Sequence, residues 1–426
     1  MDMLKTVRQA FRVPEMRRKI LFTVLMLIVF RIGSTIPVPG IDRAVLAEMF
    51  TGDYGLMDLF DLFSGGSFSN FTIFALSITP YITASIIIQL LTVAFPYFEN
   101  LAKEGQAGRK KMAQITRYVT VVLALIQALG VTVGLFNRAI VDKGWFSFTV
   151  IILVLTAGTA FLMWLGEQIN ENGIGNGISL LIFAGIVARI PSDIKSIWTQ
   201  YQDGQISIIS IVLFAVFALI VVLGIIEITQ GTRKIPVQYA KRVVGRKMYG
   251  GQSTHIPIKV NQAGVIPVIF ALSLLQLPLT LTYFWPNSGF TSFVTKWLSP
   301  AGNPGVWVYA VLNVLLIIGF NYFYTTITFN PVEVAENMKA NGGFIPGIRP
   351  GRATIEYLTR VMGRIAFVGA IFLAVIATLP TLISQFTGME IRFGGTSLLI
   401  AVGVAIDTMR QMENQMLMRN YSGFLK

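Results

Sequence analysis

The chain has 426 residues, of which 54% are hydrophobic and only 13% are charged. This composition is too apolar for a water-soluble fold of this length and indicates a membrane protein. The absence of cysteine excludes disulfides, thiolate metal sites and cysteine nucleophiles. The net charge of +13 suits an acidic or RNA-bearing partner, and it suits control of membrane topology equally well.

Ten stretches without Asp, Glu, Lys or Arg alternate with polar loops, apart from Arg31 inside the first stretch. A membrane-spanning helix needs roughly 20 residues, so the stretches predict an all-α polytopic membrane protein. The first lacks a small-residue cleavage site, and we expect it to be retained. The expected spans lie in residues 20–37, 62–98, 118–137, 145–166, 172–188, 204–226, 260–283, 297–332, 365–389 and 393–406.

The basic residues are distributed unequally between the two sets of alternating loops. One side, which holds both termini, carries 26 of the 34 basic residues, the other side carries seven, and Arg31 lies in a span. Positively charged loops stay in the cytoplasm. The pattern therefore predicts ten spans with both termini cytoplasmic.

The spans divide into five before about Gln202 and five after it. An odd number in each half forces the halves into opposite orientations, which is typical of inverted repeats with a site at their interface. We therefore expect an N-terminal half, residues 1–202, and a C-terminal half, residues 203–426.

Two of the expected cytoplasmic loops, residues 230–259 and 330–364, are long and basic. Arg349 lies within Pro-Gly-Ile-Arg-Pro-Gly, where two prolines and two glycines predict a stiff turn that presents the guanidinium. The basic residues could bind a partner, or they could act only as a topology signal.

Catalytic and ion-coupling residues are missing from the sequence pattern. Glu167, Glu227 and Asp407 lie at span ends, and the only histidine, His255, lies in a loop. Ionisable residues inside spans mark proton relays and ion sites. No metal-binding, phosphate-binding or catalytic-triad motif is present. We therefore expect neither an enzyme nor a cofactor.

A short apolar stretch precedes the second span. Residues 55–63 are apolar at helical spacing but too few to span, Gly65 and Gly66 follow, and a full-length span begins at Phe71. The pattern fits a re-entrant segment inside a cavity, and it also fits an amphipathic helix on the membrane surface.

Isoleucines recur at helical spacing in three spans. The rows are Ile78, Ile82 and Ile86; Ile178, Ile182 and Ile186; and Ile266 with Ile269. Such rows stack on one helix face, and several at one level would form an apolar constriction that excludes water and ions. Ordinary packing or lipid contact remains the alternative. Pro80 and Pro267 are expected to bend two of these spans.

Five runs resemble the SecY family, the pore subunits of bacterial Sec protein-conducting channels. They are IFALSITPYITASIIIQLL (73–91), GIGNGISLLIFAGIVA (173–188), GGQSTHIPIKVNQAGVIPVIF (250–270), GGFIPGIRPG (342–351) and GGTSLLIAVGVAID (394–407). The resemblance covers essentially the whole chain. It implies ten transmembrane helices in two inverted five-helix halves around a central hourglass pore.

The resemblance also implies site residues. A pore ring is expected at Ile78, Ile82, Ile182, Ile186, Ile269 and Ile400, with Ala405 where the family often has isoleucine. A plug is expected at about residues 55–70, including Leu56, Leu59, Phe60, Leu62, Phe63, Gly65 and Gly66. A lateral gate is expected between the second and seventh spans, with Thr79, Thr83, Gln89 and Asn261 as its polar residues. Partner docking is expected at Arg246, Lys247 and Arg349.

The function implied is movement of unfolded secretory polypeptides across the bacterial plasma membrane and lateral release of apolar segments into it. The implied partners are the small subunits SecE and SecG, the SecA motor ATPase, the ribosome, signal peptides with nascent or unfolded preproteins, and the lipid bilayer. A small-solute secondary transporter and a structural scaffold are the alternatives. A transporter should carry an intramembrane carboxylate or cation site, which the spans lack.

Overall fold

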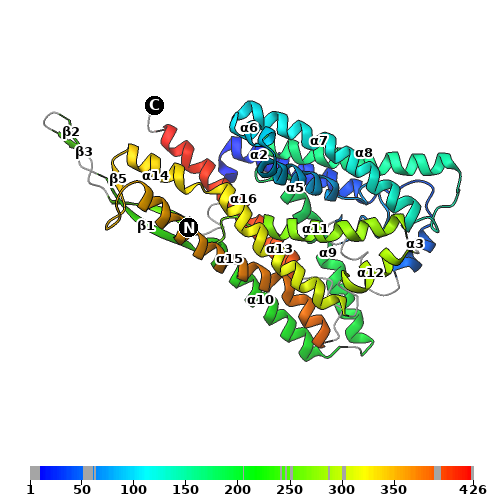
Figure 1. Cartoon of the computed structure of the whole chain (residues 1–426). Helices are drawn as coiled ribbons and strands as arrows, with labels where there is room; N and C mark the ends of the chain where they lie inside the picture. Colours follow the sequence, from blue (N-terminus) through cyan, green and yellow to red (C-terminus); the bar gives the residue numbers. More distant parts are fainter. Residues whose placement is uncertain are drawn as a thin grey trace.

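A bundle of long helices with a small β-sheet at one end forms the protein (Figure 1). The computed structural model describes residues 10–50, 61, 64–204, 206–239, 242–244, 247–249, 253–285, 288–299, 304–387 and 395–423.

Ten helices correspond to the ten expected spans. Among the described residues, seven are long and apolar enough to cross a membrane, and the bent pair α5 and α6 makes eight. The helices α2 and α16 are not among these eight, and both include turns with charged residues. The ten are α2 (Pro14–Gly33), α5 (Thr79–Ala94), α7 (Gln106–Leu129), α8 (Trp145–Asn172), α9 (Gly177–Gln202), α10 (Ile208–Gln230), α11 (Ile266–Leu281), α13 (Gly305–Thr328), α15 (Arg352–Thr387) and α16 (Gly395–Gly423).

The second span differs from the sequence prediction. Its helix begins at Thr79 and not at Phe71, because residues 64–78 form irregular, mostly buried turns. At its other end the chain turns by 99° into α6 (Pro96–Lys103). The uncharged stretch 62–98 is therefore three structural elements, which uniform hydropathy could not separate.

The predicted proline bends are also wrong. Pro80 and Pro267 lie in the first turns of α5 and α11, where the missing N–H is not needed for the helix. Pro191 in α9 and Pro278 in α11 are the prolines inside these helices. The α9 helix continues past Pro191 to Gln202, well beyond the predicted end of its span at Ala188.

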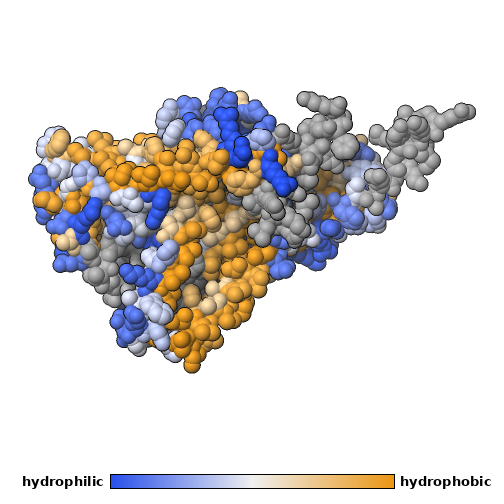
Figure 2. Space-filling view, turned by 180° about the vertical axis from the view of Figure 1, so that it is seen from behind, coloured by the Kyte–Doolittle hydropathy of each residue, from blue (hydrophilic) through white to orange (hydrophobic). Residues whose placement is uncertain are grey.

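The largest buried cluster joins both halves of the chain. It takes side chains from α5, α8 and α9 and from α10, α11, α13, α15 and α16. The outer faces of several helices are also apolar; for example, Leu213 and Leu219 on α10 are exposed. Figure 2 shows hydrophobic residues on the flanks of the helices and hydrophilic residues toward their ends. This surface pattern matches a bundle surrounded by lipid.

A second small fold is built from the two long basic loops. The strands β1 (Thr232–Tyr239) and β4 (Ser253–Lys259) pair antiparallel, and β5 (Gly343–Phe344) from the other loop pairs with β1. Apolar residues of this sheet pack against α14 (Pro331–Ala340) and the first turns of α15. We call this unit the sheet module. A short ribbon extends it, made of β2 (Arg242–Val244) and β3 (Lys247–Tyr249).

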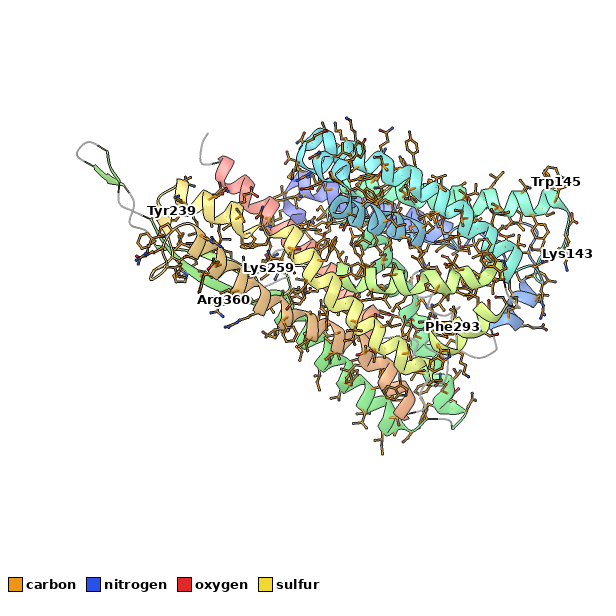
Figure 3. All side chains as sticks on the ribbon, in the orientation of Figure 1. Lys143, Trp145, Tyr239, Lys259, Phe293 and Arg360 are labelled. Atoms are coloured by element: carbon orange, nitrogen blue, oxygen red, sulfur yellow. The ribbon has the colours of Figure 1, made fainter. Side chains whose placement is uncertain are left out.

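Tyr239, Lys259 and Arg360 lie at the sheet end of the bundle, and Lys143, Trp145 and Phe293 lie at the opposite end (Figure 3). Two short helices, α3 (Arg43–Phe50) and α12 (Gly289–Trp297), also lie at that opposite end (Figure 1). The connections from α7 to α8 and from α11 to α13 thus lie at one end of the bundle, and the connection from α10 to α11 lies at the other.

Candidate functional site

Six isoleucines from four helices share the largest buried cluster. Each is at most 5% exposed. The α5 helix packs on α11, and α9 packs on α16. Isoleucine is stiff at χ1 and presents no polar atom, so such a cluster excludes water. The six are Ile78 and Ile82 at the start of α5, Ile182 and Ile186 on α9, Ile269 on α11 and Ile400 on α16.

Ala405 lies elsewhere. Its side chain is exposed and outside this cluster, whereas Val404 is buried within it. Ile400 and Val404 are four residues apart and share a helix face, and one further residue turns the side chain by about 100° away from that face. Ala405 is therefore left out of the ring proposed below.

The segment between α3 and α5 packs against α9. We call Asp61 and residues 64–70 the plug segment; the predicted plug residues Leu56, Leu59, Phe60, Leu62 and Phe63 lie outside the described residues. Gly65 and Gly66 have φ of +65° and +88°, a conformation that favours glycine. A β-carbon on Gly65 would lie 2.6 Å from the α-carbon of Gly185 on α9. The segment therefore meets α9 backbone against backbone.

Two arginines contact the plug segment from different helices. Nη1 of Arg31 on α2 donates hydrogen bonds to the carbonyl oxygen of Gly65, at 3.2 Å, and to Oγ of Ser34. Nη1 of Arg189 on α9 lies 2.9 Å from Oδ2 of Asp61, and both side chains of this ion pair are buried. The one charge expected inside a span thus binds a backbone carbonyl.

Arg189 and Asp61 are functional candidates that the sequence pattern did not single out. Arg189 follows Ile186 by three residues and Ile182 by seven, so it shares the face of α9 that carries the isoleucines. That spacing was a usable signal for Arg189. No local pattern identified Asp61 as its partner.

Polar side chains lie on α5 and in the residues that precede α11. Thr79, Thr83 and Asn261 are buried, and the hydroxyl of Thr83 donates to the carbonyl oxygen of Thr79. The side-chain carbonyl oxygens of Gln89, Asn261 and Gln262 are buried without a hydrogen-bond partner. An unsatisfied buried acceptor costs about 1–3 kcal/mol, so these groups destabilise the packing around them relative to apolar side chains.

The sheet module presents basic side chains. Arg349 is exposed in a turn whose flanking Gly347 and Gly351 have φ of +80° and +103°, as expected from its Pro-Gly frame. Its carbonyl oxygen accepts a hydrogen bond from the Thr354 hydroxyl, which joins the turn to α15. Lys247 lies on β3, and Arg246 lies outside the described residues.

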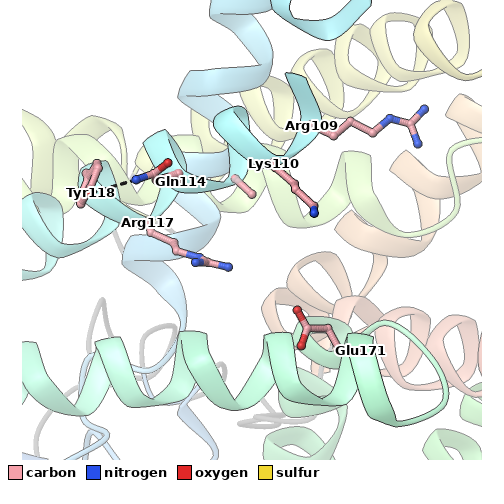
Figure 4. A pocket seen from close by; sticks show the side chains of 7 residues that line it. Arg109, Lys110, Gln114, Arg117, Tyr118 and Glu171 are labelled. Carbon is pink, nitrogen blue, oxygen red and sulfur yellow. Dashed lines mark hydrogen bonds between the residues drawn. The ribbon is translucent and has the colours of Figure 1, made fainter. Parts of the chain in front are cut away.

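A separate basic cleft of about 620 Å³ lies where α7 begins and α8 ends (Figure 4). Arg109, Lys110 and Arg117 line it together with Glu171. Arg117 also forms an ion pair with Glu167 at 2.7 Å. Most of its lining residues carry polar side chains, and none of them belongs to the isoleucine cluster.

The helix bundle, its dry isoleucine cluster and the plug segment define a class of protein. The chain is a multi-pass membrane protein in which isoleucines from both halves of the chain meet in one buried cluster. Comparison with known proteins then shows the family: the SecY family model matches residues 72–409. The chain belongs to the SecY family.

Relatives agree over the full length. The protein translocase subunit SecY of Halalkalibacterium halodurans is 52% identical, and that of Bacillus subtilis is 49% identical, each with 100% of both chains covered.

Solved structures share the fold. A protein-conducting channel has a TM-score of 0.68 at 21% identity, covering 93% of this chain and 92% of its own. Sec61 from a canine ribosome–channel complex has a TM-score of 0.64 at 19% identity, covering 93% and 92%.

The family determines the general function. The chain is the channel subunit of a protein translocase in the bacterial plasma membrane and not a small-solute transporter. Ten transmembrane helices are the architecture of this fold, in agreement with the ten helices described above.

Proposed function

We propose that the six buried isoleucines form the ring that closes the pore to ions and water. This proposal rests on one observation: four helices from both halves of the chain contribute isoleucine side chains to a single dry cluster. A translocating polypeptide has backbone groups that would be unsatisfied in lipid, so it needs a wet path on either side of the membrane. A narrow apolar ring between two wet regions limits ion leakage and parts when its helices separate.

The plug segment closes the same passage from the end that is opposite the sheet module. Its backbone contact with Gly185 places it beside the face of α9 that carries Ile182 and Ile186. Displacement of this segment and separation of the ring helices together open the pore. In a SecY protein of solved structure, with a TM-score of 0.65 and 21% identity to this chain, the plug domain stabilises the closed state of the translocation channel and maintains a membrane seal.

The contact between α5 and α11 is the lateral gate. Thr79, Thr83, Gln89 and Asn261 make this contact less apolar than the surrounding core, which lowers the free energy needed to part the helices. A sufficiently apolar segment then leaves the pore for lipid, because burial of apolar surface contributes roughly 25 cal/mol per Å².

The sheet module is the docking surface for the partner that drives translocation, either the SecA motor or a ribosome. Arg349, Lys247 and Arg246 carry the positive charge that attracts an acidic or RNA-bearing partner. The distribution of basic residues supports a cytoplasmic location for this module and for both termini. SecE, SecG and lipid cover the apolar outer faces of the helices.

Site-specific crosslinking tests the pore. A photoreactive residue at position 82 should crosslink to a stalled secretory precursor, because the chain passes through the ring. Leu153, exposed on α8, is the matched lipid-facing position and should give no crosslink. Absence of a crosslink at 82 in an engaged complex would show that the isoleucines only pack the core.

A further inference from the structure

A buried pair of opposite charges joins the plug segment to α9. Arg189 Nη1 lies 2.9 Å from Asp61 Oδ2, with only 9% and 6% of the two side chains exposed. In contrast, the pair of Arg352 and Glu356 on α15 is largely exposed. Exposed pairs contribute little to stability, whereas separation of a buried pair leaves two charges without compensation.

The carboxylate of Asp61 is oriented from within the plug segment. Its Oδ1 accepts hydrogen bonds from the Ser64 hydroxyl, at 3.1 Å, and from the backbone N–H of Ser69, at 2.9 Å. Oδ2 therefore faces α9. The guanidinium N–H is not aligned for a hydrogen bond with it, so the attraction is Coulombic.

The position of the pair on α9 connects it to the ring. Gly185, which contacts Gly65, is followed by Arg189 four residues later on the same face, next to Ile182 and Ile186. The plug segment is thus attached to α9 at two successive turns, first by close packing and then by charge. Buried Asp193, one further turn along α9, is the next acidic residue on this face.

We propose that the Asp61–Arg189 pair is an electrostatic latch that holds the plug segment on α9 in the closed channel and must separate for opening. This inference rests on the proposed role of the plug segment. In the closed state each charge compensates the other. When the plug segment leaves α9, both charges enter the wet passage. Intermediate positions would leave the charges separated but still buried, so the pair favours two discrete states over gradual loosening.

A double-mutant cycle on single-channel currents tests the latch. Asp61→Asn keeps the Oδ1 acceptor but removes the charge, and Arg189→Gln removes the partner charge. Each single variant should raise the open probability of the idle channel by roughly tenfold or more, because it leaves one buried charge unpaired. The double variant should leak less than the product of the two single effects.

Two controls have no part in the latch. Asp42→Asn keeps a local hydrogen bond to the Ala44 N–H at an exposed site, and Arg138→Gln removes an exposed charge. Both should leave the idle channel silent. If Arg189→Gln is not inserted in the membrane, Arg189→Lys replaces it, and its leak should lie between those of the wild type and Asp61→Asn.

Silent single variants, or effects that multiply independently in the double variant, would overturn the latch. Deletion of residues 56–63 separates this outcome from failure of the plug itself. If the deletion variant leaks while the charge variants stay silent, only the latch is refuted. If the deletion variant is silent, both the plug role and the latch are refuted.

Discussion

Gly65 in the plug segment and Gly185 on α9 are so close that a β-carbon on Gly65 would lie 2.6 Å from the Gly185 α-carbon. Real β-carbons do not approach other carbons this closely, so the contact exists only because position 65 has no side chain. This fit makes the position of the plug segment on α9 specific, and it makes Gly65 a sensitive point for mutation.

Gly65→Ala should therefore displace the plug segment and make the idle channel leak. The matched control is Gly66→Ala. Its φ of +88° gives a similar backbone strain of about 1 kcal/mol, but its nearest neighbouring atom, Asn70 Nδ2, is 4.0 Å away. Ion flux through proteoliposomes measures the difference. Equal leakage of the two variants would attribute the effect to backbone strain and not to the contact with α9.

Simultaneous Ile82→Gly and Ile186→Gly replacement should raise ion conductance through the idle channel, because the apolar ring loses side chains from two helices. Ile225→Gly with Ile317→Gly is the control, since these residues are buried in the same cluster but on α10 and α13. Both pairs should cost roughly 2–5 kcal/mol per residue in stability. Unchanged single-channel conductance of the first pair would count against the ring.

Deletion of residues 56–63 should give a channel that flickers between open and closed states, because the plug then lacks its first part, including Asp61 and the ion pair of Asp61 with Arg189 on α9. Electrical recording from planar bilayers measures the dwell times. A deletion variant that stays silent would argue against a plug.

Arg349→Glu should reduce translocation while leaving membrane insertion of the channel unchanged, because the exposed turn loses and reverses its charge. Lys143→Glu, a charge reversal at the opposite end of the bundle, is the control and should translocate normally. The rate of preprotein import into vesicles is the measurement. Normal import by the Arg349 variant would remove its docking role.

Leu358→Ala should destabilise the sheet module by about 2–5 kcal/mol, since Leu358 is fully buried against the sheet and α14. Loss of this packing should lower the temperature at which proteolysis cuts residues 230–259. Leu153→Ala, on the lipid-facing side of α8, should leave that temperature unchanged. An unaltered module in the Leu358 variant would show that its residues do not fold as one unit.

The sequence by itself determined the existence of ten spans and the isoleucine rows. Span formation is a local property: about 20 apolar residues suffice, and no distant contact is required. The positions of Ile82, Ile182 and Ile186 on their helix faces follow equally from residue spacing. Hydropathy could not locate the start of α5, because the buried turns of residues 64–78 are as uncharged as the helix that follows them.

Only the tertiary structure decided which distant residues meet. The sheet module takes β1 and β4 from one loop and β5 from another that is about a hundred residues away. Asp61 and Arg189 are separated by most of the N-terminal half, yet they form a buried ion pair. Such pairs depend on how helices pack, and side-chain periodicity gives the face of each helix but not its neighbour. The helix face that carries each isoleucine could therefore be predicted from residue spacing, whereas the contacts between the plug segment and α9 required the fold.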